Sequence, residues 1–275
     1  MPDLFEEEYA LAKKLSGITD ELGSRVFERV RNGPPEAAPE SFQRADRGRL
    51  GTPMEQHDAA YTYLGLAFLL LKHDGLTIPS GGKNLGPDML FHFAGHAFRE
   101  IGQLNRAADA YRRAGVVSTR GKTPKEFGIR SLARAKMCYE EIGESERSDQ
   151  MHCLEWEARR LGSLGFRRLF LWLWAVTSRY GTDVRQWAKM FARVVLVSAL
   201  VYECMHSLGW IYGQEHWTPI VSSLYCSVVT MTTLGYGDFV PHHWVAQLFV
   251  ILNVFAGYFL LAVGATILGK KVIGR

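Results

Sequence analysis

The sequence lacks the cysteine patterns that define disulfide frameworks and zinc sites. Its four cysteines are scattered, with no CxxC pair among them, so we expect free thiols that are buried by default. Blocks of basic residues are also absent. The formal net charge is only +4, and lysines and arginines are interspersed with acidic residues, which argues against nucleic acid as a partner.

Charged residues almost disappear in the last third of the chain. Up to about Leu161 the sequence is charged and helix-rich, whereas long apolar runs begin near Met190. The near-zero mean hydropathy therefore averages two different halves. The first ten residues are acidic and lack the apolar core of a secretory signal. We expect the first half to be soluble and cytoplasmic, and the second half to lie in a membrane.

The soluble half contains several segments with helical spacing. Residues 3–30 predict one or two amphipathic helices, and a further helix begins near Tyr61. Between them, residues 31–53 are rich in proline and glycine and predict a loop or flexible connection. Residues 80–87 predict a glycine-rich break.

A helical hairpin is predicted between Phe91 and Ala114, with its turn at Gly102 and Asn105. Small residues let two helices approach closely while aromatic residues fill the space between them. This pattern resembles the tetratricopeptide repeat, and a weaker copy follows near Leu132 to Glu155. A plain helical bundle is the alternative, because the intervals between copies are irregular. The residues that carry the pattern are Ala94, Gly95, Phe98, Gly102, Ala107, Tyr111 and Ala114.

Residues 166–187 join the two halves through a short apolar stretch and a polar turn at Ser178 to Asp183. The apolar stretch, Leu169 to Val176, would span only about 12 Å as a helix, which is too short to cross a hydrocarbon core of about 30 Å. Flanking arginines and two tryptophans indicate a helix at the inner membrane interface. A buried helix of the soluble domain is the alternative.

Two membrane spans are predicted, at 191–210 and 244–268. Positive charges precede the first span and follow the second, so both chain ends are expected in the cytoplasm. Glu203 lies within the first span and should pair with a polar group such as His206, because an isolated carboxylate is costly in lipid. Four aromatic residues predict a belt at the outer interface: Trp210, Tyr212, Trp217 and Trp244.

The segment between the spans carries the most specific motif. Thr218 can cap a helix whose first turn holds Pro219, which predicts a short helix over 219–232. Such a helix cannot span and must be re-entrant. It leads into Thr230-Met-Thr-Thr-Leu-Gly-Tyr-Gly-Asp238. Carbonyls of successive residues can point the same way only where the backbone alternates with left-handed conformations, which Gly235 and Gly237 adopt at little cost.

This motif between two spans resembles the signature of potassium channels. The resemblance implies that the carbonyls of Thr233, Leu234, Gly235 and Tyr236 replace the hydration shell of K⁺, with the Thr233 hydroxyl as the innermost ligand ring. Gly237 completes the filter, Tyr236 points into an aromatic cuff, and Thr230, Thr232 and Asp238 support it. Leu234 departs from the commoner valine or isoleucine, which bears on fine selectivity.

One chain supplies one pore loop, so four chains would have to surround the ion. In the second span, Gly257 lies where this family commonly has its gating hinge, and Gly264 is a second flexible point. Small residues for close helix packing are the alternative at both positions. No arginine-rich voltage-sensing helix is present in the sequence.

The sequence thus predicts an all-α protein with a helical-repeat domain before a two-span pore. We expect a homotetrameric, potassium-selective channel of the inner membrane, opened through its cytoplasmic domain, with K⁺ as the permeant ion and no cofactor. The alternatives are a weakly selective cation channel and a membrane-anchored scaffold for protein partners. An enzyme is not expected, since His92 and His96 lack a HExxH arrangement. The expected parts are a soluble domain at 1–165, a linker helix at 166–187 and a pore domain at 188–275, with outer helix 190–212, pore helix 219–232, filter 233–238 and inner helix 243–268.

Overall fold

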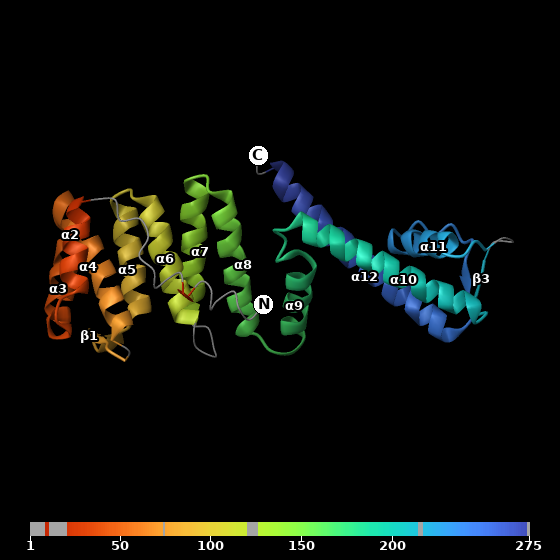
Figure 1. The fold of residues 1–275 in the computed structure, drawn as a ribbon, viewed down its shortest axis with the longest axis horizontal. Helices are drawn as coiled ribbons and strands as arrows, with labels where there is room; N and C mark the ends of the chain where they lie inside the picture. Colours follow the sequence, from red (N-terminus) through yellow and green to blue (C-terminus); the bar gives the residue numbers. More distant parts are fainter. Residues whose placement is uncertain (1–8, 11–20, 74, 120–125, 214–216, 274–275) are drawn as a thin grey trace. The chain divides into compact units, whose positions relative to one another are not determined.

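A computed structural model describes residues 9–10, 21–73, 75–119, 126–213 and 217–273 (Figure 1). The chain divides into two compact units, 1–168 and 169–275. Most of the expected helix at 3–30 lies outside the described residues. The two units are described separately below.

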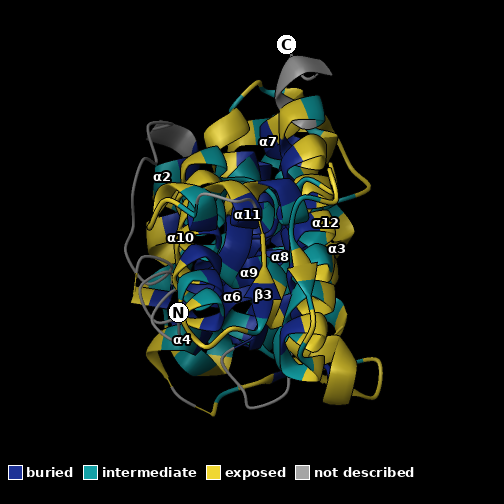
Figure 2. Cartoon of the chain, turned by 90° about the vertical axis from the view of Figure 1, so that its right-hand side faces the viewer, coloured by how far each residue is buried: buried dark blue, intermediate teal, exposed yellow. Residues whose placement is uncertain are grey.

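The first unit is a row of helices (Figure 1). From α4 to α8 each helix packs against the next one along the chain, whereas α2 and α3 both pack against α4. Its buried core is rich in alanine and aromatic side chains, coloured dark blue in Figure 2. The elements are α2 (Glu21–Arg31), a 3-10 turn (Pro35–Ala37), α3 (Ala38–Gly48), α4 (Pro53–Lys72), the hairpin of β1 (Ile78–Ser80) and β2 (Lys83–Leu85), α5 (Pro87–Glu100), α6 (Leu104–Thr119), α7 (Glu126–Glu141) and α8 (Ser145–Leu161).

The loop predicted over residues 31–53 is wrong, because helix α3 occupies much of it. Pro39 falls in the first turn of α3, where a missing amide hydrogen costs nothing. Ala38, Phe42 and Ala45 are buried at helical spacing and pack α3 into the core. The sequence-based prediction overlooked the helical spacing of these buried residues because the prolines of the segment indicate a loop.

The predicted hairpin at Phe91 to Ala114 corresponds to α5 and α6. Gly102 has a φ of +76° in the turn between them, whereas Asn105 already belongs to α6. A Cβ atom on Gly95 would lie 2.8 Å from the Tyr111 ring, so a side chain there would force the two helices apart. The next turn, between α7 and α8, repeats the arrangement with Gly143 at a φ of +78°.

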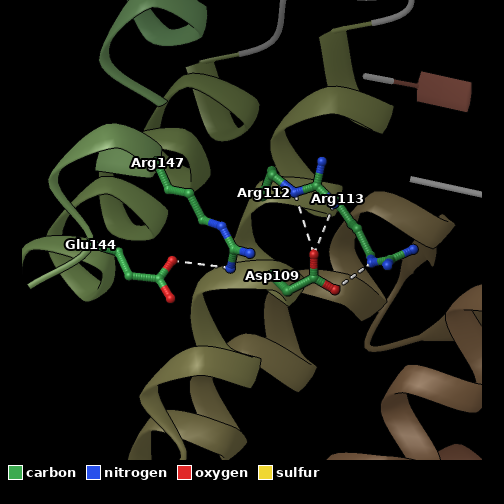
Figure 3. Close-up of polar contacts among 5 residues, drawn as sticks. All are labelled: Asp109, Arg112, Arg113, Glu144 and Arg147. Carbon is green, nitrogen blue, oxygen red and sulfur yellow. Dashed lines mark hydrogen bonds and ion pairs between the residues drawn. The ribbon is translucent and has the colours of Figure 1, made fainter. Parts of the chain in front are cut away.

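A partly buried ion-pair cluster lies on α6 (Figure 3), and Arg113 is its buried member. Asp109 accepts hydrogen bonds from Arg112 Nη2 at 2.9 Å and from Arg113 Nε at 2.7 Å, and the Arg113 guanidinium lies over the Phe68 ring. Although burial opposes ionisation, the two arginines hold the pKa of Asp109 below its ordinary value. A separate pair, Glu144 with Arg147 at 3.0 Å, is also shown in Figure 3.

The second unit contains three long helices and one short one. Two short strands, β3 and β4, pair antiparallel, with Ile211 opposite Pro241. All four cysteines of the chain are free thiols, as expected. Three of them are buried, whereas Cys204 is exposed, contrary to the expectation. The elements are α9 (Gly165–Ser178), α10 (Val184–Ser207), β3 (Ile211–Tyr212), α11 (Val221–Met231), β4 (Val240–Pro241) and α12 (Trp244–Ile273).

The bounds of these helices correct several sequence-based expectations. The predicted linker helix at 166–187 is two helices, because α9 ends at a turn in which Arg179, Tyr180 and Gly181 all have positive φ. Asp183 then caps α10 by accepting from the backbone amides of Arg185 and Gln186. The outer helix therefore begins at Val184 rather than 190. It ends at Ser207 rather than 212, since the following residues leave the helix to form β3.

The inner helix continues to Ile273, beyond the predicted end at 268, and passes through Gly269 without a break. Among the described residues, one helix, Trp244–Gly269, is long and apolar enough to cross a membrane by length and composition alone. The first predicted span, within α10, does not qualify as a membrane-crossing helix by the same criteria of length and composition. It carries Arg193 and Glu203 within its length.

Candidate functional site

Helix α11, which corresponds to the predicted pore helix, begins at Val221, two residues later than predicted. Thr218 does not cap it with its side chain. Instead, Ile220 stands at the N-cap with a φ of +69°, a conformation that is costly for a β-branched residue. The amide of Ser222 donates to the Thr218 carbonyl at 3.0 Å and closes the turn.

Glu203 of α10 binds the residues at the start of the pore helix. Its carboxylate accepts hydrogen bonds from the Ser223 hydroxyl, from Trp217 Nε1 at 3.2 Å and from the Ile220 amide at 3.3 Å. A negative charge is favoured at a helix N-terminus, where amide hydrogens are unpaired. Glu203 thus pairs with polar groups, as predicted, but these belong to Ser223 and to residues just before α11. The example given, His206, instead stacks on the Trp217 ring, with 3.9 Å between centroids.

A second contact fixes the same helix one turn further on. The buried Ser227 hydroxyl donates to the Val195 carbonyl of α10 at 3.0 Å. Ser223 and Ser227 are four residues apart and therefore lie on one face of α11. The serine face sets the pore helix against the outer helix.

The pore helix ends in a Schellman motif that leads directly into the filter segment. The Leu234 amide donates to the Val229 carbonyl and the Thr233 amide to the Thr230 carbonyl, both at 3.1 Å. Thr233, at the position where glycine is usual in this motif, has a φ of +58°. The sequence predicted Thr233 as a filter residue but not its left-handed conformation, because threonine gives no signal for it.

The filter segment has a positive φ at every second residue. The values are +58° at Thr233, +51° at Gly235 and +78° at Gly237. Residues 233–237 are all exposed in the single chain, including 58% of Leu234 and 67% of Tyr236. The segment is therefore accessible to other chains or to an ion.

Aromatic side chains pack beside this segment. The Tyr236 ring is stacked against Tyr225 of α11, with 6.5 Å between centroids, and Tyr225 also contacts Phe239. The Tyr225 side chain hydrogen-bonds with Asp238. Asp238, Tyr236 and the pore helix are therefore held together within one chain.

The two glycines of the inner helix both make close contacts. A Cβ atom on Gly257 would lie 2.2 Å from the Met231 carbonyl oxygen, at the end of the pore helix. One on Gly264 would lie 2.4 Å from the ring of Trp187, whose Nε1 donates to the Leu260 carbonyl at 2.8 Å. At each glycine, a neighbouring group therefore packs directly against the helix backbone, and a side chain at that position would displace it.

Comparison with known proteins identifies the class of this region. Residues 190–273 match the family described as "Ion channel". This segment is therefore similar to the ion-channel domains of that family, whose members reside in membranes. The match includes most of α10 and all of α12. Helix α10, which did not qualify as a membrane span by length and composition, therefore lies largely within the matched region.

The curated relatives that match this region at low identity are potassium channels or their regulatory subunits. The two-pore potassium channel 3 of Arabidopsis thaliana is 35% identical over 75 residues, which cover 27% of this chain and 16% of the relative. The voltage-gated potassium channel regulatory subunit KCNG2 of Gallus gallus is 31% identical over 104 residues, 38% of this chain and 19% of the relative.

The corresponding subunit KCNG4 of Mus musculus is 29% identical over 91 residues, 31% of this chain and 18% of the relative. The chain spans less than one fifth of the length of these relatives. No solved structure gives a significant match. The matched family and relatives are channels or channel subunits and are not enzymes.

Proposed function

We propose that four copies of this chain form a potassium-selective pore, with the carbonyls of Thr233, Leu234, Gly235 and Tyr236 as the K⁺ ligands and Gly237 at the outer end. The observation that carries the proposal is the alternation of positive φ through the TMTTLGYGD segment. Such alternation turns successive carbonyls toward one side, where they can replace the hydration shell of an ion. The potassium-channel relatives support the same ion class.

The tetramer is proposed because one chain supplies only one filter segment. That segment is exposed in the single chain, and a closed ring about the ion needs several copies. Exposed apolar residues on α10 and α12 leave surface for lipid and for neighbouring subunits: Leu196, Val197, Leu200, Leu248, Ile251, Leu252 and Phe255. Basic residues before the first span and after the second support the proposal that both termini lie in the cytoplasm.

A filter substitution tests the proposal directly. We expect wild-type proteoliposomes to take up K⁺ and to discriminate strongly against Na⁺. Gly235→Ala places a side chain where φ is +51°, so it should abolish K⁺ flux or selectivity. Gly75→Ala is a matched control, because Gly75 also has a positive φ, of +85°, but lies in the first unit.

The alternatives give different results in the same assay. Equal Na⁺ and K⁺ flux in wild type would indicate a weakly selective cation channel. No flux under any condition, together with a stable protein partner, would indicate a scaffold built on the helical first unit.

We further propose that the first unit gates the pore. Its stacked hairpins with small residues at the contacts support the tetratricopeptide-like interpretation, and such arrays commonly bind peptides or proteins. Helix α9, whose Phe166, Leu169 and Trp172 are exposed beside Arg167 and Arg168, is proposed to lie at the inner membrane surface. Gly257 and Gly264 remain candidate bending points of the inner helix.

Removing residues 1–184 tests this gating proposal. The truncated channel should conduct K⁺ with a changed open probability. An unchanged open probability in single-channel records would exclude the first unit from gating.

A further inference from the structure

The middle of the inner helix contains a buried amide that the motif does not explain. Asn253 is 4% exposed and lies within the apolar helix α12. A polar group in such a place is costly unless its hydrogen bonds are made. Its position therefore requires partners from other helices.

Those partners come from the outer helix. The Ser198 hydroxyl donates to Asn253 Oδ1 at 2.9 Å, and Asn253 Nδ2 donates to the Tyr202 hydroxyl at 3.1 Å. Ser198 and Tyr202 are four residues apart on α10 and are both buried. The amide is therefore clamped between two successive turns, which fixes the register of α12 against α10.

The chain of hydrogen bonds continues to the pore helix. The Tyr202 side chain also hydrogen-bonds with Thr230, and its ring contacts Phe249 of α12 at 5.3 Å between centroids. Thr230 is the residue whose carbonyl accepts from the Thr233 amide in the Schellman motif. A polar chain thus leads from the inner helix to the first residue of the filter segment.

A steric contact joins the same two elements one helical turn further along α12. Gly257, four residues after Asn253, fits against the Met231 carbonyl, and no Cβ atom could be accommodated there without a shift. The inner helix therefore contacts the end of the pore helix in two ways: through the hydrogen bonds of Asn253 and Tyr202, and through the close backbone contact at Gly257.

We infer that Asn253 and Tyr202 are positioning residues that hold Thr230, and through it the base of the filter, at a geometry set by the inner helix. This inference rests on the proposed potassium pore. The residues touch no ion; they act through the backbone at Thr230 and Thr233. A displacement of α12 at this level would reach the filter by the same route.

The test compares K⁺ over Na⁺ permeability ratios, from reversal potentials of the full chain in planar bilayers with the two ions on opposite sides. Tyr202→Phe removes one oxygen atom and Asn253→Leu removes the amide at similar volume. Each should lower the ratio at least about fivefold, and the double variant should be no worse than the stronger single one, since both break one chain. Tyr212→Phe is the matched control, because that ring is exposed on β3.

Two further variants separate positioning from general packing. Thr230→Ser retains the hydroxyl and should keep the wild-type ratio, whereas Thr230→Val has the same shape without it and should lower the ratio. If Asn253→Leu fails to assemble, Tyr202→Phe and the Thr230 pair decide the question.

Unchanged ratios in Tyr202→Phe and Thr230→Val would overturn the inference while leaving the pore intact. A wild-type chain without K⁺-dependent current would instead refute the proposed function itself. The two failures are therefore distinguishable in one set of recordings.

Discussion

The contact between Gly264 and Trp187 distinguishes a packing role from a hinge role for a glycine of the inner helix. In Gly264→Ala, the new Cβ atom would lie 2.4 Å from Trp187 Cζ2 and 2.7 Å from Cε2. The ring cannot easily retreat, because its Nε1 is hydrogen-bonded to the Leu260 carbonyl at 2.8 Å. Overpacking of this kind costs about 1–3 kcal/mol, against a helix-propensity gain of about 1 kcal/mol for alanine over glycine.

We therefore expect Gly264→Ala to lower the unfolding free energy by up to about 2 kcal/mol. Trp187→Leu removes the atoms that clash, so the alanine should become neutral or stabilising in that background. The two substitutions should show a coupling energy of at least about 1 kcal/mol in a double-mutant cycle. The measurement is denaturant-induced unfolding of the full chain in detergent micelles, with all four variants under one condition.

A hinge role predicts a different pattern. If Gly264 matters only because it bends, alanine should stiffen the helix equally whether residue 187 is tryptophan or leucine. Additive effects, with a coupling energy below about 0.5 kcal/mol, would refute the packing argument.

Three other predictions follow from polar contacts, all measured by unfolding of the full chain. Glu203→Gln should destabilise the pore domain by about 1–2 kcal/mol, because it removes the charge that accepts from Ser223 and the Ile220 amide; no loss would contradict this role. Asp109→Asn should cost about 1–3 kcal/mol, since it removes the negative charge that accepts hydrogen bonds from Arg112 and Arg113, and an effect below about 0.5 kcal/mol, about that of a surface substitution, would count against it. Burial and the neighbouring Arg134 lower the pKa of His92 to about 4, so the folded state favours the neutral ring. Stability should be complete above about pH 6.5 and fall by about 1–2 kcal/mol toward pH 4, and His92→Gln should flatten this dependence.

The second unit was more predictable from sequence than the first unit. The filter motif is a short continuous stretch of sequence, and glycines at 235 and 237 predict the left-handed conformations that the structure has there. Its support is not local. Glu203 reaches groups 14 to 20 residues away, and Ser198 meets Asn253 across 55 residues, so no pattern in a short window could reveal these pairs.

The errors have equally specific causes. Proline-rich composition concealed α3, because proline is harmless in the first turn of a helix. The late start of α11 and the conformation of Thr233 depend on tertiary contacts that override the preferences of isoleucine and threonine. Helix spacing predicted that α5 and α6 form a hairpin, and the glycine at the turn marked its position.

The central claim is that peptide carbonyls of Thr233 to Tyr236 select K⁺. The most direct test is the reversal potential of the purified full chain in planar bilayers, as the K⁺ gradient is varied against constant Na⁺. The account predicts that it follows the K⁺ equilibrium potential, and that Gly235→Ala abolishes this dependence. A reversal potential that ignores the K⁺ gradient, or one unaffected by Gly235→Ala, would contradict it.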